Sequence, residues 1–167
     1  MSDVKPVPYL DLVTQFKQLE GEWLETIKKT GAAGSFILGP NVGAFEQEFA
    51  KYCGVKHAIG VANGTDSLIL SLRALDIGPG DEVITSPFTF FASSEAIDVV
   101  GATPVFADIL PDSFCIDPDS VRKCITNKTK AILPVHIFGH TTEMQAIIQL
   151  ARQHGVAAVA DYDQALG

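Results

Sequence analysis

The sequence has little that would cross-link it, hold zinc through thiolates or cross a membrane. Its three cysteines, Cys53, Cys115 and Cys124, are an odd number with no Cys-x-x-Cys pair, which indicates neither a disulfide framework nor a zinc site. No run approaches the roughly 20 apolar residues of a membrane span. Residues Met1–Lys5 also lack the apolar core of a signal peptide. We therefore expect a cytoplasmic protein with reduced thiols.

Positive charge is scarce as well. Twelve Lys and Arg residues stand against twenty Asp and Glu residues, which gives a net charge of -8. This balance argues against a nucleic-acid partner or an anionic membrane surface, so any bound phosphate must be held by a local binding site. With 47% apolar and 19% charged residues, the 167-residue chain has enough apolar side chains for a packed domain.

One stretch, residues 58–68, combines an apolar run rich in β-branched residues, a glycine and a helical pattern. We predict a strand over 58–62, a turn at Gly64 and a helix capped by Thr65 or Asp66. Free amides and the positive end of the helix dipole would then meet at residues 64–67, where an anion can bind. The same pattern is equally compatible with a helix cap that binds nothing.

The remaining elements alternate in a regular way. Helices are predicted over 9–30 and 42–52, separated by a loop over 31–40, and further helices over 92–100, 118–124 and 143–154. Strands are predicted over 82–85, 105–107, 131–135 and 156–160. This order predicts an α/β fold, a three-layer α/β/α arrangement around a mostly parallel sheet. We divide the chain into an N-terminal helix and loop, 1–40, and a sheet region, 41–167.

Several chemically useful residues fall just beyond predicted strand ends, where ligands bind in such sheets. They are Thr65, Phe90, His136, Asp161 and Gln164. A phosphate-binding turn, a flat aromatic ring and a carboxylate are what pyridoxal 5'-phosphate (PLP) needs. The carboxylate would pair with the pyridine nitrogen and keep it protonated.

The chain resembles the N-terminal part of the DegT/DnrJ/EryC1/StrS family of sugar aminotransferases, which belongs to fold type I of the PLP enzymes. The resemblance covers nearly all residues, and in combination its motifs are specific. They lie at residues 37–42, 45–50, 63–68, 79–83, 88–90, 101–106 and 134–136.

The resemblance implies a PLP-dependent enzyme that transfers an amino group from an amino acid such as glutamate to a nucleotide-linked keto sugar. It implies that Gly64 and Thr65, with the amide of Asp66, hold the phosphate, and that Phe90 stacks on the cofactor ring. Asp161 would meet the pyridine nitrogen, and Gln164 would approach the ring hydroxyl. It further implies a homodimer and an incomplete large domain in this chain.

Two features depart from the family pattern. Tyr162 and Asp163 stand where the family places small residues, and the second carboxylate adds negative charge to the site. The lysine that forms the Schiff base in the family lies beyond the Asp-x-x-Gln segment, and no lysine follows Lys130 here. We therefore expect no catalytic residue in this chain, and the 167 residues alone to be inactive.

Other interpretations of the same residues remain open. Phe90 lies between Phe88 and Phe91 and could pack in the core. Asp161 and Asp163 could bind a divalent cation in a nucleotide- or metal-binding domain, although no GxxxxGK[ST] loop accompanies them. His136 and His140 have a metal-like spacing, but Gly139 makes a loop the better interpretation, and we predict no metal site. A noncatalytic homologue or partner subunit is the main alternative to the aminotransferase.

Overall fold

The computed structural model describes residues 7, 8 and 10–166, and the chain forms two compact units, Met1–Gly60 and Val61–Gly167. Tyr9, where the first helix is predicted to begin, and Met1–Lys5, whose composition argues against a signal peptide, lie outside the described residues. The division we predict at residue 40 falls inside the first unit. That division and the assignment of the chain to one large domain stay predictions.

The first unit consists of two helices, α1 (Leu12–Ala33) and α2 (Pro40–Tyr52). The Asp11 carboxylate caps α1 by accepting a hydrogen bond from the Thr14 amide at 3.0 Å, and Gly34 ends the helix in a left-handed conformation, φ 62°. The helix therefore begins and ends about three residues later than predicted, and residue 31 is helical rather than part of a loop. Pro40 opens α2 because its fixed φ suits a first helical position.

The second unit is built on four parallel strands in the order β2-β1-β3-β4. The strands are β1 (Glu82–Thr85), β2 (Thr103–Phe106), β3 (Thr129–Leu133) and β4 (Ala157–Ala158). The four strands after residue 80 are thus confirmed, although β2 and β3 begin two residues earlier than predicted and β4 is shorter. Beyond β3 and β4 the pairing continues as a single parallel bridge between Val135 and Asp161.

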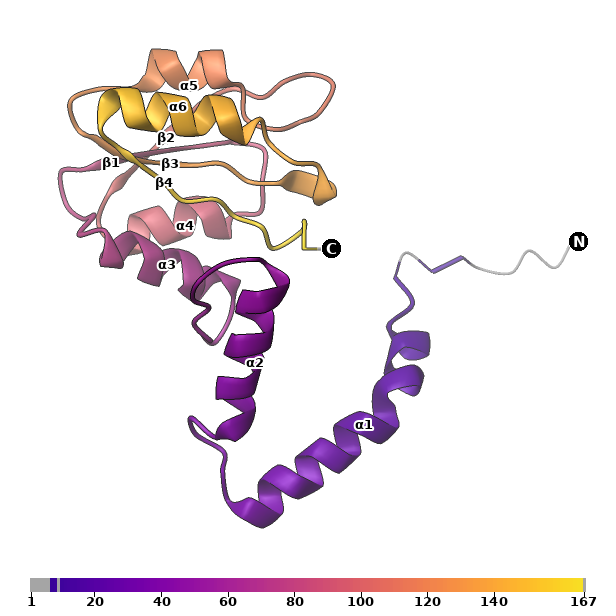
Figure 1. Ribbon diagram of the computed structural model, residues 1–167. Coiled ribbons are helices and arrows are strands. Elements are labelled where there is room, and N and C mark those ends of the chain that lie inside the picture. Colours follow the sequence, from indigo (N-terminus) through magenta and orange to yellow (C-terminus); the bar gives the residue numbers. More distant parts are fainter. Residues whose placement is uncertain (1–6, 9, 167) are drawn as a thin grey trace, which may run out of the picture. The chain divides into compact units, whose positions relative to one another are not determined.

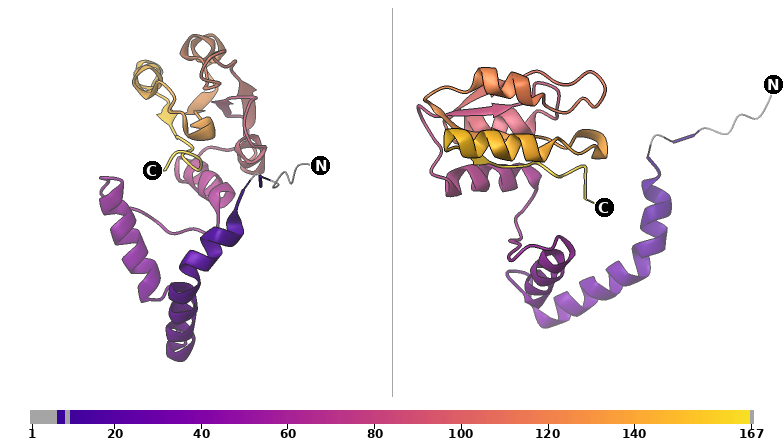
Figure 2. Two further views of the ribbon diagram at one scale, coloured as in Figure 1. Left: turned by 90° about the vertical axis from the view of Figure 1, so that its right-hand side faces the viewer. Right: turned by 45° about the horizontal axis from the view of Figure 1, so that its top comes forward.

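Helices cover both faces of this sheet (Figures 1 and 2). One face packs against α3 (Gly64–Ala74) and α4 (Ala92–Val99), the other against α5 (Pro118–Cys124) and α6 (Met144–His154). Side chains alternate accordingly: Val83 lies in the first core, and Ile84 lies in the second. The three-layer α/β/α arrangement predicted from the sequence is confirmed.

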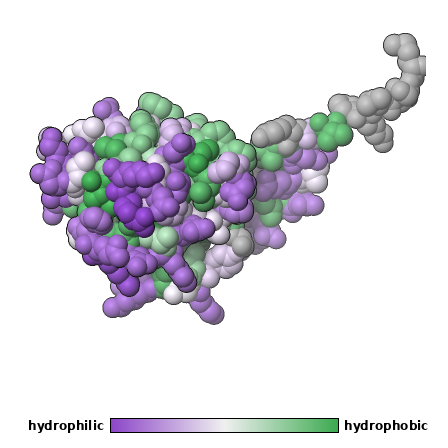
Figure 3. Space-filling view, turned by 90° about the horizontal axis from the view of Figure 1, so that it is seen from above, coloured by the Kyte–Doolittle hydropathy of each residue, from purple (hydrophilic) through white to green (hydrophobic). Residues whose placement is uncertain are grey.

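The outer surface over α5 and α6 is mainly hydrophilic, with some apolar patches (Figure 3). Along α6, Ile147, Leu150 and Ala151 face the core while the charged Arg152 is exposed, as expected for a helix that covers one face of a sheet. No helix in the described part of the chain is both long and apolar enough to cross a membrane.

The prediction of a strand over 58–62 is wrong. These residues form no part of the described sheet, and Ile59 is 81% exposed. Their β-branched composition favours an extended backbone, but a strand also needs a neighbour to satisfy its amides and carbonyls, and none of the four described strands pairs with them.

The prediction of Thr65 or Asp66 as the cap of α3 is also wrong. Asn63 is extended, φ -164° and ψ 175°, and its side-chain oxygen accepts a hydrogen bond from the Asp66 amide at 2.8 Å. Helix α3 therefore begins at Gly64, earlier than a Thr65 cap would allow.

Candidate functional site

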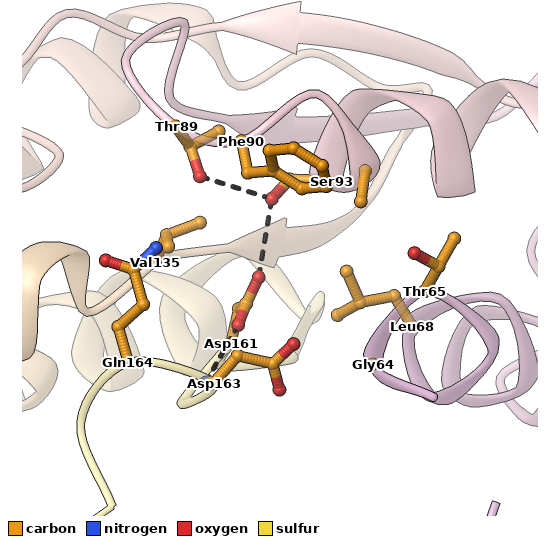
Figure 4. A pocket seen from close by; sticks show the side chains of 11 residues that line it. Gly64, Thr65, Leu68, Thr89, Phe90, Ser93, Val135, Asp161, Asp163 and Gln164 are labelled. Carbon is orange, nitrogen blue, oxygen red and sulfur yellow. Dashed lines mark hydrogen bonds between the residues drawn. The ribbon is translucent and has the colours of Figure 1, made fainter. Parts of the chain in front are cut away.

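A pocket of about 270 Å³ opens in the second unit at the carboxyl ends of the strands (Figure 4). Four separate segments supply its walls: the start of α3, the loop before α4 together with the first residues of α4, the residues after β3 and the residues after β4. The lining residues are Gly64, Thr65, Leu68, Thr89, Phe90, Ala92, Ser93, Val135, Asp161, Asp163 and Gln164. The fold therefore brings together five of the six predicted cofactor-binding residues.

The wall from α3 presents a helix N-terminus. In the described part of the chain, the amides of Gly64 and Thr65 donate no hydrogen bond, so both are free for an anion. Asp66, the sixth predicted residue, does not line the pocket. Its amide donates to Asn63 Oδ1, and its carboxylate accepts from Asn63 Nδ2 at 3.1 Å. To hold a phosphate as predicted, the Asp66 amide would have to break its hydrogen bond to Asn63 Oδ1 or donate to both acceptors.

The Asp161 carboxylate lines the pocket, and hydrogen bonds hold both the backbone and the side chain of this residue. Its amide donates to Pro134 O at 2.9 Å and its carbonyl accepts from the His136 amide at 3.0 Å, which extends the pairing of β3 and β4. Oδ1 accepts from the Asp163 amide at 3.1 Å, and Oδ2 accepts from the Ser93 hydroxyl at 3.4 Å. The carboxylate is thus oriented before any ligand binds.

Ser93 is a part of the site that sequence reasoning missed. It is 1% exposed, and its oxygen also lies 3.4 Å from Thr89 Oγ1, so the two hydroxyls and Asp161 form a short chain (Figure 4). The available signal was the i, i+4 spacing of Thr89 and Ser93 at the start of a helix that follows a strand. A buried serine alone gives no such indication, because small hydroxyl residues are common at helix starts.

Phe90 and Gln164 frame the mouth of the pocket. Phe90 is 73% exposed, so the alternative that it packs in the core is wrong, and its ring is free to stack on a flat ligand. Gln164 Oε1 accepts from the Phe138 amide at 2.8 Å. Because a backbone amide can only donate, this bond fixes the carboxamide orientation and leaves Nε2, which has no partner among the described residues, as a donor on the side of Val135 (Figure 4).

Asp163 lies against the start of α3. A β-carbon added to Gly64 would overlap Asp163 Oδ2 and would lie 2.9 Å from Asp163 Cγ. Partial burial, and then the negative charge of Asp161, raise the pKa of the Asp163 carboxyl. Asp163, whose carboxylate departs from the family pattern, therefore lies at the same helix end that would bind a phosphate.

His136, predicted at the rim, does not line the pocket. It is fully buried, its Nδ1 accepts from the Thr142 amide at 2.9 Å, and its ring packs at a tilt against Tyr162, with 4.1 Å between ring centroids and 39° between the ring planes. The bond to Nδ1 places the proton of the neutral ring on Nε2, which has no partner in the described part of the chain. Burial lowers the pKa of His136, although Asp161 acts in the opposite direction.

The metal-related alternatives find no geometric support. His136 and His140 flank a short 3-10 turn, Ile137–Gly139, so they do not share a helix face, as the glycine indicated. Among the described residues, no three His, Cys, Asp or Glu side chains gather as metal ligands would. Cys53 is exposed, Cys115 buried and Cys124 partly buried, and all three are free thiols.

The chain is similar to sugar aminotransferases along most of its length. A relative from Acidithiobacillus ferrooxidans, the UDP-N-acetyl-3-dehydro-alpha-D-glucosamine 3-aminotransferase, is 45% identical over 167 residues, which are 100% of this chain and 45% of that protein. This chain spans less than half the length of the first relatives it matches.

Solved structures agree with this similarity. Streptomyces venezuelae DesV in complex with a ketimine intermediate superposes with a TM-score of 0.96 at 44% identity, over 98% of this chain and 44% of that one. NtdA from Bacillus subtilis, with bound cofactor PMP, has a TM-score of 0.94 at 34% identity, over 99% of this chain and 38% of that one. Related structures thus contain PLP or PMP. The model of the DegT/DnrJ/EryC1/StrS aminotransferase family matches residues 17–167, and the chain belongs to that family.

Proposed function

We propose that this chain supplies the phosphate, ring and pyridine-nitrogen contacts of a PLP-dependent aminotransferase. The amino group would pass from an amino acid such as glutamate to a keto sugar linked to a nucleotide. One observation carries the proposal: a single pocket gathers an open helix N-terminus, an exposed aromatic ring and a carboxylate held by two hydrogen bonds. Relatives named as sugar aminotransferases support the substrate class.

Each lining residue has a role in this proposal. Bound PLP supplies a ring that accepts electrons from the reacting carbon. The free amides of Gly64 and Thr65 would donate to its phosphate, with the helix dipole adding to the attraction. Phe90 would cover one face of the ring. Asp161 would keep a proton on the ring nitrogen, and Gln164 Nε2 would donate to the ring hydroxyl oxygen.

Ser93 would position the Asp161 carboxylate. Its hydroxyl and the Asp163 amide occupy one lone pair on each carboxylate oxygen, which holds the plane of the group while leaving other lone pairs open to the pocket. The fit to PLP is good at Asp161, Phe90 and Gln164. At the start of α3, the negative charge of the Asp163 carboxylate would repel the phosphate.

A noncatalytic homologue that binds the cofactor is the second candidate. It is favoured by one observation: no described residue that lines the pocket is a lysine. A cofactor held only by these residues would be bound without a covalent link, and amino transfer would require a lysine from elsewhere.

We also propose that the protein forms a homodimer in the cytoplasm. Helix α1 has no buried residue, and apolar side chains along it, including Phe16, Trp23 and Ile27, are 45–65% exposed. An apolar stripe of this kind on a helix requires a partner surface, and a second copy of the chain would provide one. Sedimentation equilibrium should give a dimer mass; a monomer at high concentration contradicts this part of the proposal.

The test of cofactor binding is a titration of the chain with PLP, followed by the change in cofactor absorbance. Phe90→Ala should weaken the affinity about tenfold, because stacking on a ring contributes roughly 1–3 kcal/mol. Phe106→Ala is a matched control, since Phe106 is also exposed, at 50%, but does not line the pocket. Equal affinity of the Phe90→Ala variant and the unaltered chain would contradict the placement of the ring.

A second assay separates the two candidates. A form of the protein with bound PLP is mixed with glutamate and a nucleotide-linked keto sugar, and 2-oxoglutarate is measured. Its production supports the aminotransferase, whereas PLP binding without its production supports the noncatalytic homologue.

A further inference from the structure

We propose that the Asp163 carboxylate is an internal anion that competes with the cofactor phosphate for the N-terminus of α3. The affinity of the site for phosphate would then rise when Asp163 loses its charge. This inference rests on the proposed cofactor site, and it adds a regulatory property that the roles of the other lining residues do not contain.

Asp163 is positioned beside the start of α3. The Asp163 amide donates to Asp161 Oδ1 at 3.1 Å, which fixes the backbone at this point and directs the Asp163 side chain towards α3. Its carboxylate points at Gly64 (Figure 4), and a β-carbon added there would lie 3.2 Å from Asp163 Oδ1. A phosphate that accepts hydrogen bonds from the amides of Gly64 and Thr65 needs the same space.

The described part of the pocket lining carries negative charge. The described lining residues include two carboxylates, Asp161 and Asp163, and no lysine or arginine. A phosphate entering this pocket would meet like charge without a cation to offset it. At about 5 Å, the repulsion between a carboxylate and a phosphate changes the affinity by about tenfold or more, even at a dielectric constant close to that of water.

The Asp163 carboxyl group is disposed to take up a proton. Partial burial of the carboxyl group, and then the charge of Asp161, raise the pKa of Asp163, so a proton is taken up more readily there than on an ordinary aspartate. The other titratable groups on the surrounding elements are Asp66, whose carboxylate is bonded to Asn63, His136, whose pKa is lowered by burial, and Tyr162. None of these places a positive charge beside Asp163, and an incoming phosphate would favour its protonated form further.

The competition predicts a pH dependence with a definite sign. As the pH falls through the raised pKa of Asp163, the carboxylate becomes neutral and the affinity of the unaltered chain for phosphate should approach that of Asp163→Asn. As the pH rises, the two affinities should separate. Taking the ratio of the two dissociation constants cancels the part of the phosphate titration that both proteins share, and leaves the interaction between the charges of Asp163 and the phosphate.

The experiment measures dissociation constants of the chain and of Asp163→Asn by calorimetry, with PLP, with pyridoxal and with inorganic phosphate. Asp163→Asn should bind PLP and phosphate about tenfold more tightly than the unaltered chain at neutral pH, and pyridoxal equally well. Asp98→Asn is the matched control, because it removes one charge from an exposed position outside the pocket, and it should change none of the three constants. Circular dichroism verifies that each variant is folded.

The outcomes separate this inference from the proposed function. Equal affinities of the chain and Asp163→Asn for PLP and phosphate overturn the competition, while PLP binding itself still supports the cofactor site. If neither protein binds PLP but Asp163→Asn binds phosphate more tightly, the proposed function fails and the competition stands. If neither protein binds PLP or phosphate, the proposed function and the competition are both overturned.

Discussion

The contact between Asp163 and Gly64 predicts a measurable coupling between substitutions at the two positions. With Asp163 replaced by alanine, Gly64→Ala should stabilise the second unit by about 0.5 kcal/mol, because alanine loses less backbone entropy than glycine in a helix. With Asp163 present, the new β-carbon would overlap the carboxylate, which must then rotate away.

The size of this coupling follows from the interactions that the Asp163 side chain would lose, and the strain it would gain, on rotating away from Gly64. The carboxylate would lose its favourable position at the helix N-terminus, worth about 0.3–1 kcal/mol, and a strained side-chain torsion would cost about 0.5–1.5 kcal/mol. Asp163 is exposed, so its side chain can move and the lower part of each range applies. We expect a coupling free energy of about 1 kcal/mol, with a sign that makes Gly64→Ala less favourable when Asp163 is present.

The assay is urea unfolding of the chain, the two single variants and the double variant, followed by circular dichroism. Fluorescence is unsuitable, because the single tryptophan, Trp23, lies in α1 of the first unit. Gly43→Ala is the control: nothing lies within 4 Å of a β-carbon added at this helical position, so it should be additive with Asp163→Ala. A coupling free energy below about 0.3 kcal/mol between Gly64→Ala and Asp163→Ala would refute the contact. Substitutions at distant, independent sites already deviate from additivity by about that much.

Three further predictions concern the residues around Asp161. In a form of the protein that turns over, Asp161→Asn should lower kcat on the order of tenfold while changing the PLP dissociation constant less, because an amide cannot hold a proton on the ring nitrogen; unchanged kcat would contradict the assignment. Ser93→Ala should lower the unfolding free energy by about 1 kcal/mol and weaken PLP binding, measured by denaturation and titration, whereas Ser93→Thr should retain binding. Burial lowers the pKa of His136 in the folded protein, so the neutral ring should stabilise the fold fully above its ordinary pKa of 6.5, and this stabilisation should be lost as the pH falls through the folded pKa. Urea unfolding at acidic pH should therefore show a smaller loss of unfolding free energy for His136→Asn than for the unaltered chain. An equal loss in the two proteins would refute this.

The sequence alone determined the elements whose signals are local. The short β-branched strand Glu82–Thr85 is bounded by turn residues on both sides and was predicted with its observed bounds. Pro118 and Gly155 mark a helix start and a helix end, because proline suits the first helical turn and glycine adopts the left-handed conformation that follows the last. The alternation of these elements was sufficient to predict the three-layer fold.

Where several local signals compete, the sequence could not choose between them. Asn63, Thr65 and Asp66 are all good helix caps, and only the extended backbone at Asn63 selects it. The apolar run over 58–62 has the composition of a strand, but strand formation depends on a partner that no local pattern specifies. Only the structure showed that none of the described strands pairs with it.

The site itself divides in the same way. The positions beyond strand ends indicated Phe90, Asp161 and Gln164, because parallel strands place their carboxyl ends at one edge. The helix-start pattern over residues 64–67 and the family resemblance indicated Gly64. Only the tertiary structure placed the Ser93 hydroxyl, 68 residues away in sequence, on the Asp161 carboxylate. It alone also showed that the extra carboxylate after Asp161 lies against the start of α3, because this contact depends on how α3 packs on the sheet beside the end of β4.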